Sequence, residues 1–130
     1  MSQENVEVVR KGNAAYRRGD WEVLAKLIDP HISIRTDVSW PEQRMYGRDA
    51  AIAFYRGISE SGGADTRIEE IIDLGDRVLV RLHWHVRGLH SGIEGEQRYS
   101  AISTLRDGRI ILEEFFLDHE QALKAVGLAE

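Results

Sequence analysis

The chain has 130 residues, of which 42% are hydrophobic and 30% are charged, so its size and composition are those of a folded domain. Its formal net charge is −5 at pH 7, and its basic residues are scattered along the chain. This distribution argues against nucleic-acid binding, which usually needs a clustered basic surface. Because the chain contains no cysteine, disulfides, thiolate zinc sites and cysteine nucleophiles are excluded.

The first residues, 1–5, are polar and acidic, and they lack the basic and apolar segments of a secretion signal. No apolar run approaches the roughly 18 residues that a membrane-spanning helix needs. We therefore expect a cytoplasmic protein without a membrane partner.

Helices are predicted first along the chain. Apolar residues at helical spacing predict a helix from about Ser2 to Arg18, which Gly19 ends. Asp20 is placed to cap a second helix, which should end at Asp29–Pro30 because a residue before proline is pushed out of the α region. The later predicted elements are a strand over 31–36, a loop over 37–46, a helix over 48–59, strands over 66–74, 77–87, 95–105 and 110–117, and a helix over 119–126.

The strand over 77–87 alternates along its whole length. Leu82 and Trp84 fall on one face, and His83 and His85 fall on the other. We expect the apolar face to lie toward the helices and the histidines to point outward.

Helices followed by strands with tight turns predict an α+β fold, in which the helices cover one face of an antiparallel sheet. Long strands twist, so this sheet should curve around the helices and leave a cavity between the two layers. No linker or repeat interrupts the pattern, and we expect a single domain over 1–130.

Several short segments stand in a characteristic order along nearly the whole chain. They are 8–10 (VVR), 15–21 (AYRRGDW), 27–30 (LIDP), 46–48 (YGR), 104–110 (TLRDGRI), 116–118 (FLD), 121–123 (QAL) and 127–128 (GL). Together they resemble SnoaL-like proteins of the nuclear transport factor 2-like superfamily. The resemblance implies a cone-shaped fold, with helices packed on a strongly curved antiparallel sheet.

The resemblance does not fix an activity, because similar proteins include polyketide cyclases, steroid isomerases, dehydratases, epoxide hydrolases and members without a known activity. The isomerases use a carboxylate base, a tyrosine and a protonated aspartic acid. Counted from Gly19–Asp20, these positions hold Thr36, Gly12 and Ile102 in this chain. Steroid-isomerase chemistry is therefore not expected.

Glu113 is the candidate catalytic residue. If Phe115 and Leu117 face the core, Glu113 does too, because alternate strand residues share a face. Burial would raise the pKa of its carboxyl group, as a general acid or base requires. Two alternatives are that Glu113 pairs with an arginine, or that the register places Glu114 inside instead. Asp118, the other acidic candidate, is better explained as the cap of the last helix.

His83 and His85 share a strand face at a spacing that suits a metal ion. They point away from the core beside Arg81 and Arg87, whose charges would repel a divalent cation, and no third ligand is evident. We therefore expect no metal and no cofactor, and a solvated or interfacial role for the two histidines.

Aromatic residues are candidates for the cavity wall, since a tyrosine offers an apolar ring with a polar tip. The predicted pocket residues are Tyr16, Trp40, Tyr46, Tyr55, Tyr99 and Ser103. Trp40 and Tyr46 lie in the loop near the expected mouth, and the small side chain of Ser103 leaves room beside Tyr99. The alternative is that most of these rings simply fill the core.

Three functions remain open from the sequence. The chain binds a small hydrophobic molecule in its cavity. Alternatively, it is a cofactor-free lyase, isomerase or cyclase that acts on a hydrophobic carbonyl compound, with Glu113 as general acid or base and Tyr16 or Tyr99 as hydrogen-bond donor. In the third case it is a dimeric interaction module without a ligand.

A homodimer through the outer face of the sheet is also expected. By the predicted register, Leu79, Ile102 and Phe116 lie on that face, and they would leave too much apolar surface in water.

Overall fold

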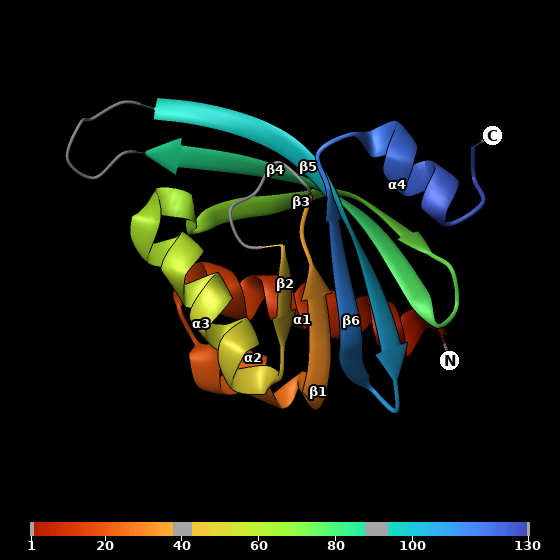
Figure 1. Cartoon of the computed structure of the whole chain (residues 1–130), viewed down its shortest axis with the longest axis horizontal. Helices are drawn as coiled ribbons and strands as arrows, with labels where there is room; N and C mark the ends of the chain where they lie inside the picture. The colour runs from red at the N-terminus through yellow and green to blue at the C-terminus, as the bar shows by residue number, and fades with distance from the viewer. Residues whose placement is uncertain (1, 38–42, 88–93, 130) are drawn as a thin grey trace.

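The computed structural model describes residues 2–37, 43–87 and 94–129. Its helices are α1 (Ser2–Arg18), α2 (Trp21–Lys26), α3 (Arg48–Ile58) and α4 (His119–Ala125), with a π-helical turn, η1 (Ser59–Gly63), after α3 (Figure 1). Its strands are β1 (Ile28–Arg35), β2 (Arg44–Tyr46), β3 (Asp65–Asp73), β4 (Arg77–Arg87), β5 (Glu94–Arg106) and β6 (Arg109–Phe116).

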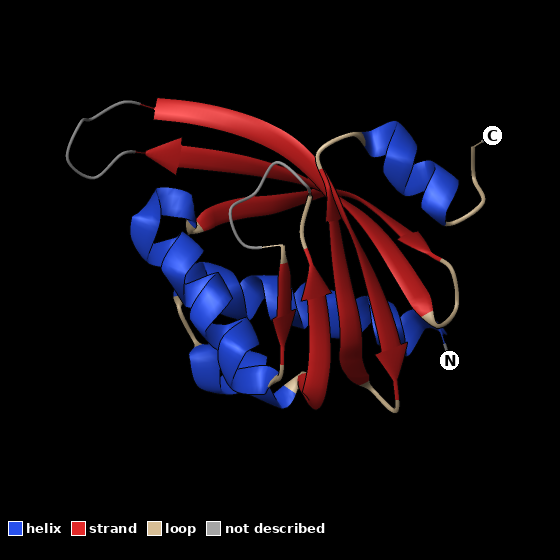
Figure 2. Ribbon diagram, in the orientation of Figure 1, coloured by secondary structure: helices blue, strands red, loops and turns tan. Residues whose placement is uncertain are grey.

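The strands form one curved sheet in the order β2-β1-β6-β5-β4-β3 (Figure 2). Neighbouring strands run antiparallel except β1 and β6, which are parallel. Helices α1, α2 and α3 pack on one side of the sheet, which we call the inner face, and α4 packs on the opposite, outer face. The α+β fold with helices on a curved sheet is therefore confirmed.

Two predicted helix caps are present. The Asp20 carboxylate accepts a hydrogen bond from the backbone N–H of Val23 at 3.2 Å, and Asp118 accepts one from Glu120 at 2.9 Å. Each satisfies a backbone donor that the first turn of a helix leaves without a partner. The start of α2 and that of α4 thus follow from a single local residue.

The predicted end of the second helix was wrong. Helix α2 ends at Lys26, and β1 already begins at Ile28, which lies opposite Ile110 of β6. The backbone N–H of Ile110 also donates to the carbonyl of Leu27 at 2.9 Å. Pairing with a strand far along the chain therefore ends this helix before Asp29–Pro30 is reached.

The segment predicted as a loop over 37–46 ends in β2, a strand that pairs with β1. Met45 lies opposite Ile34 and is buried, while Arg44 and Tyr46 on either side are exposed. This alternation decides where Tyr46 lies, as described below.

The outer face is covered by the chain itself. Leu79 and Ile102 lie opposite each other on β4 and β5 and are each 1% exposed, because α4 packs over them with Ala122 and Phe116 joins the same cluster. The expectation that these residues form exposed apolar surface was wrong, and with it the reason given for a homodimer. A homodimer itself stays a prediction. None of the described helices is long and apolar enough to cross a lipid bilayer.

Candidate functional site

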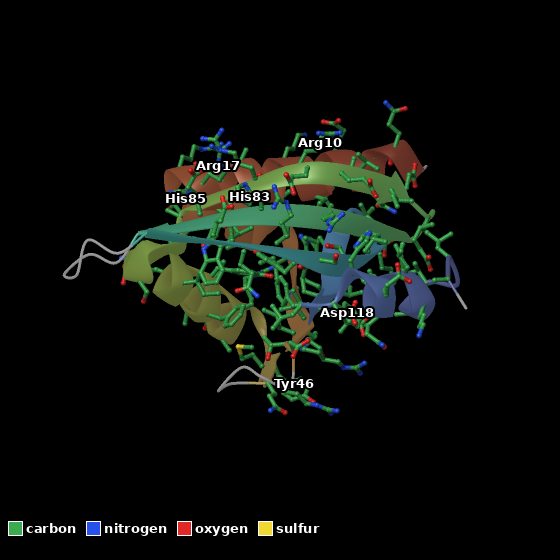
Figure 3. The ribbon with its side chains drawn as sticks, turned by 90° about the horizontal axis from the view of Figure 1, so that it is seen from above. Arg10, Arg17, Tyr46, His83, His85 and Asp118 are labelled. Atoms are coloured by element: carbon green, nitrogen blue, oxygen red, sulfur yellow. The ribbon has the colours of Figure 1, made fainter. Side chains whose placement is uncertain are left out.

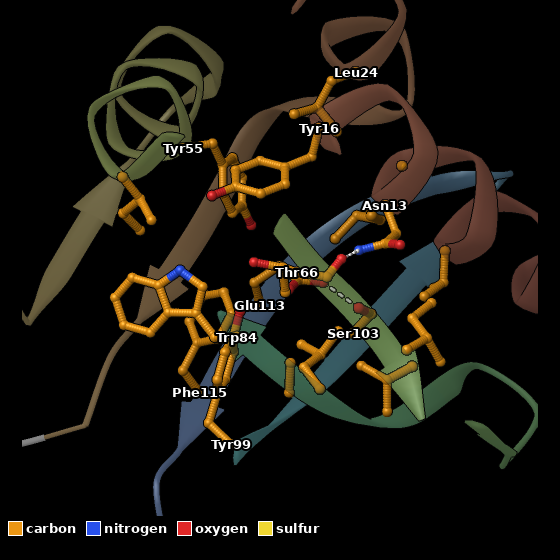
Figure 4. Close-up of a pocket in the computed structure, with 18 of the residues that line it drawn as sticks. Asn13, Tyr16, Leu24, Tyr55, Thr66, Trp84, Tyr99, Ser103, Glu113 and Phe115 are labelled. Carbon is orange, nitrogen blue, oxygen red and sulfur yellow. Dashed lines mark hydrogen bonds between the residues drawn. The ribbon is translucent and has the colours of Figure 1, made fainter. Parts of the chain in front are cut away.

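A cavity of about 100 Å³ lies between the inner face and the helices (Figure 4). Most of its wall is aliphatic or aromatic and comes from α1, α2, α3 and all strands except β2. Among the described residues that form this wall, Glu113 has the only carboxyl group, and none is a lysine, arginine or histidine. The chemistry of the cavity thus centres on one acid.

Glu113 is held in the wall by the pairing of β5 with β6. Ser103 lies opposite it, and the Ser103 hydroxyl donates a hydrogen bond to Glu113 Oε1. The side chain is only 7% exposed, and burial raises the pKa of Glu113 to about 7, with the hydrogen bond from Ser103 opposing the shift and the charge of Glu114 adding to it. Near neutral pH both forms of the acid are therefore populated.

The register predicted for Glu113 is confirmed. Glu114 points the other way and forms an ion pair with Arg35, with 3.7 Å between Oε2 and the guanidinium. Among the described residues Glu113 has no arginine partner, so neither alternative considered for it holds.

Tyr16 of α1 is tied to the start of the sheet. Its hydroxyl donates to the carbonyl oxygen of Gly63 at 2.6 Å, and the Thr66 hydroxyl donates to the same oxygen at 3.1 Å. Asn13 Nδ2 donates to the Thr66 carbonyl at 3.1 Å (Figure 4). Burial raises the pKa of Tyr16 to about 12, although a hydrogen bond with Thr66 opposes it. The Tyr16 hydroxyl therefore uses its proton in a hydrogen bond that joins α1 to η1, next to the start of β3.

Tyr55 of α3 and Tyr99 of β5 also line the cavity. Burial, to which the charge of Glu113 adds, raises the pKa of both phenols well above their usual range. Both hydroxyls thus stay protonated near neutral pH and keep a proton to donate. The charge of Glu113 raises the pKa of both tyrosines, so the three side chains are close enough to interact electrostatically in the cavity.

Trp84 fills the space left by a glycine. Its indole Nε1 is buried without a partner among the described residues, and a Cβ built on Gly63 would lie 2.4 Å from it. Only glycine at this position lets the indole ring pack against η1. The contact joins two elements, and the sequence analysis did not predict it.

The structure brings together most of the predicted pocket residues. Tyr16, Tyr55, Tyr99, Ser103 and Glu113 all line the cavity. Trp40 lies outside the described residues.

Tyr46 does not line the cavity, and its prediction as a pocket residue was wrong. The alternation of β2 turns Met45 inward, so the ring of Tyr46 is 67% exposed (Figure 3). Sequence reasoning also missed Thr66 and placed Trp84 in the core without assigning it to the site. Thr66 accepts a hydrogen bond from Asn13, 53 positions away, and Trp84 packs against Gly63 of η1, so contacts between elements bring both residues to the site.

The outward orientation of the two histidines is confirmed. His83 and His85 lie near each other (Figure 3). His83 Nε2 lies 3.0 Å from Glu96 Oε2, and both histidines border a hollow with Asp65 and Arg67. The described residues contain no cluster of three or more His, Cys, Asp or Glu side chains that is suited to a metal ion. The histidines thus belong to a charged surface on the far side of the sheet from the cavity.

Comparison with known proteins agrees with this architecture. A nuclear transport factor 2-like protein of unknown function from Burkholderia pseudomallei superposes with a TM-score of 0.76 at 20% identity, over 95% of this chain and 97% of that one. TerC, crystallised with polyporic acid, gives 0.74 at 19% identity over 95% and 98%. A proposed SnoaL-like polyketide cyclase from Jannaschia gives 0.74 at 21% identity over 98% and 94%.

At these identities the solved structures show the fold alone. A search of curated protein sequences found no significant match. The model of the SnoaL-like domain family matches residues 9–113, most of the chain. This chain therefore belongs to the SnoaL-like domain family and has the fold of nuclear transport factor 2-like proteins.

Proposed function

We propose that this protein is an enzyme that moves a proton next to the carbonyl group of a small hydrophobic molecule, with Glu113 as general base and acid. One observation carries the proposal. Glu113 is a buried carboxyl group in a mostly apolar cavity, and burial brings its pKa to about 7. A general acid–base group works best when its pKa lies near the working pH.

The reaction begins with ionised Glu113. Its carboxylate takes a proton from the carbon next to the carbonyl group, and the electrons of the broken C–H bond form the double bond of an enolate. The enolate oxygen accepts a hydrogen bond from Tyr55 or Tyr99, whose phenols stay protonated. Tyr16 is not needed as this donor, because its hydroxyl already donates a hydrogen bond to the carbonyl oxygen of Gly63.

The enolate can react in three ways. Protonated Glu113 returns its proton to a different carbon in an isomerase. In a lyase the enolate expels a leaving group from the neighbouring carbon, and protonated Glu113 gives its proton to that group. In a cyclase the enolate carbon attacks a second carbonyl group of the same molecule, and Glu113 protonates the alkoxide that forms there. The cavity of about 100 Å³ is smaller than the usual ligand pocket of about 300–1,000 Å³, which favours a compact substrate.

Binding without turnover is a second candidate function. The cavity wall is mostly apolar, as in sites for small hydrophobic molecules. Catalysis requires Glu113 to gain and lose a proton, whereas binding of a hydrophobic molecule does not.

Hydrogen–deuterium exchange of acetone and cyclopentanone in D₂O, followed by proton NMR, tests the proposal. The protein should accelerate exchange at the carbons beside the carbonyl group, and the rate should rise with pH around a midpoint near 7, since the ionised base is the active form. Glu113→Gln should reduce this rate by about a hundredfold or more. Glu69→Gln, which removes a carboxylate from the outer face, is the matched control and should exchange at the wild-type rate.

Equal rates for the Glu113→Gln variant and the wild type would remove Glu113 from the mechanism. Binding of either ketone to the wild type without accelerated exchange would favour the second function.

A further inference from the structure

Ionised Glu113 is a buried negative charge without a positive partner. Among the described residues its one polar contact is the hydroxyl of Ser103. The basic side chains on the surrounding elements are engaged elsewhere or lie in solvent: Arg35 pairs with Glu114, Arg48 donates to the carbonyl of Ile28, and Arg98 pairs with Glu69. Buried charges in proteins are ordinarily paired, so the charged form of this site lacks a cation.

The walls around this carboxyl group are unusually rich in aromatic rings. The ring centroids of Tyr16 and Tyr55 lie 6.2 Å apart with planes at 75°, and those of Trp84 and Tyr99 lie 6.3 Å apart at 83° (Figure 4). Each pair packs edge to face, and all four rings also line the cavity. Aromatic faces attract cations, and cages of such rings recognise methylated ammonium groups.

The size of the cavity limits what can enter. An apolar protein cavity of about 150 Å³ holds benzene, which has six heavy atoms. By the same scale the cavity of about 100 Å³ suits an occupant of roughly four heavy atoms. Trimethylammonium has four, and its methyl groups suit an apolar wall.

We propose that this cavity is a binding site for a compact alkylammonium ion of the size of trimethylammonium. Its positive charge lies against the Glu113 carboxylate, and its methyl groups contact Tyr16, Tyr55, Trp84 and Tyr99. The site disfavours anions, because an anion would meet Glu113 and find no basic residue among the described residues of the wall. The inference goes beyond the proposed function, since it needs neither a carbonyl group nor turnover.

Binding of the cation is coupled to the proton of Glu113. The cation stabilises the carboxylate, so the pKa of Glu113 falls when the site is occupied, and binding below pH 7 releases a proton. The other titratable groups that face the cavity are the phenols of Tyr16, Tyr55 and Tyr99, which stay protonated throughout this range. Glu114, on the outer face, affects Glu113 only through its charge.

Calorimetric titration with trimethylammonium chloride and with neutral tert-butanol tests the inference. At pH 8 the cation should bind the wild type at least about tenfold more tightly than tert-butanol does. Glu113→Gln should remove this preference and leave tert-butanol binding unchanged, which also shows that the variant is folded. At pH 6, titrations in two buffers of different ionisation enthalpy should reveal proton release.

Two further variants locate the site. Tyr55→Leu should weaken cation binding more than tert-butanol binding, whereas Tyr55→Phe, which keeps the ring, should preserve both. Glu69→Gln should bind the cation as the wild type does, because its carboxylate lies on the outer face. Equal affinity of the wild type for the two probes, or undiminished cation binding by Glu113→Gln, would overturn the inference. These titrations use no ketone, so their result does not depend on whether the protein accelerates deuterium exchange of a ketone.

Discussion

Two glutamates on the same sheet show how its two faces differ. Glu69 of β3 is exposed on the outer face, where Arg98 Nε donates to its carboxylate at 2.8 Å, and this hydrogen bond lowers the pKa of Glu69. Glu113 of β6 lies on the inner face, where burial raises its pKa to about 7. A glutamate is thus an ion-paired carboxylate on the outer face, whereas on the inner face it can gain and lose a proton near neutral pH. The sheet keeps its many charges in solvent and isolates a single acid in the cavity.

The two faces also differ in packing. Under α4 the outer face is filled, with Leu79 and Ile102 each 1% exposed. Over part of the inner face the same strands border a cavity, and Leu82 lies in its wall. This contrast predicts different costs for the same truncation.

Leu79→Ala should have the largest effect on stability, about 3 to 4 kcal/mol, because it opens a void in a filled cluster. Leu82→Ala should cost about 1 kcal/mol less, since part of its surface already faces empty space and loses fewer contacts. Urea denaturation of both variants measures the difference. If Leu82→Ala costs as much as Leu79→Ala, the inner face is packed and the cavity is not open.

The pH dependence of stability should reveal Glu113 next. Its pKa in the folded chain, about 7, lies above the ordinary value of 4.5, so the folded protein holds a proton that the unfolded chain has lost. Stability should therefore fall as pH rises from about 5 to 8.5, by up to roughly 3 kcal/mol from this group. Asp65 and Glu69, whose pKa values are lowered, titrate below this window.

The free energy of unfolding at pH 5 and at pH 8.5, for the wild type and for Glu113→Gln, measures this contribution, since other groups cancel in the comparison. The variant should lose less stability than the wild type over this interval. An identical loss in both proteins would show that Glu113 titrates normally.

The smallest effect is expected for Glu69→Gln. It removes the ion pair with Arg98, but both side chains are exposed, and surface ion pairs contribute little. Thermal unfolding of the variant should match that of the wild type in high salt, with at most a slight difference in low salt. A loss comparable to that of Leu82→Ala would mean that the charged outer network stabilises the sheet.

The sequence predicted the strands well where their pattern was long. The alternation over 77–87 located β4 and the faces of Trp84 and His83, and the same rule placed Glu113 inside with Phe115. It failed at the end of α2, where pairing of Ile28 with β6 overrides the local signals. It also failed at β2, which is too short to show a pattern.

The candidate site could be predicted only in part, for a similar reason. Glu113 followed from strand periodicity, and Tyr16 was selected for its aromatic ring. The hydrogen bond from Tyr16 to Gly63 joins residues 47 positions apart, and the one from Asn13 to Thr66 joins residues 53 positions apart. Such contacts depend on how α1 docks against η1 and β3, which no local pattern encodes.

The pKa of Glu113 decides whether this carboxyl group can act as an acid and base in the cavity. Carbon NMR of the glutamate carboxyl groups, with Glu113→Gln and Glu69→Gln to assign two resonances, would follow both acids through one titration. The burial of Glu113 and the ion pair of Glu69 predict a midpoint near 7 for Glu113 and one below 4.5 for Glu69. A midpoint for Glu113 at or below 4.5 would contradict this prediction, because a carboxyl group that titrates there is not buried in a mostly apolar cavity.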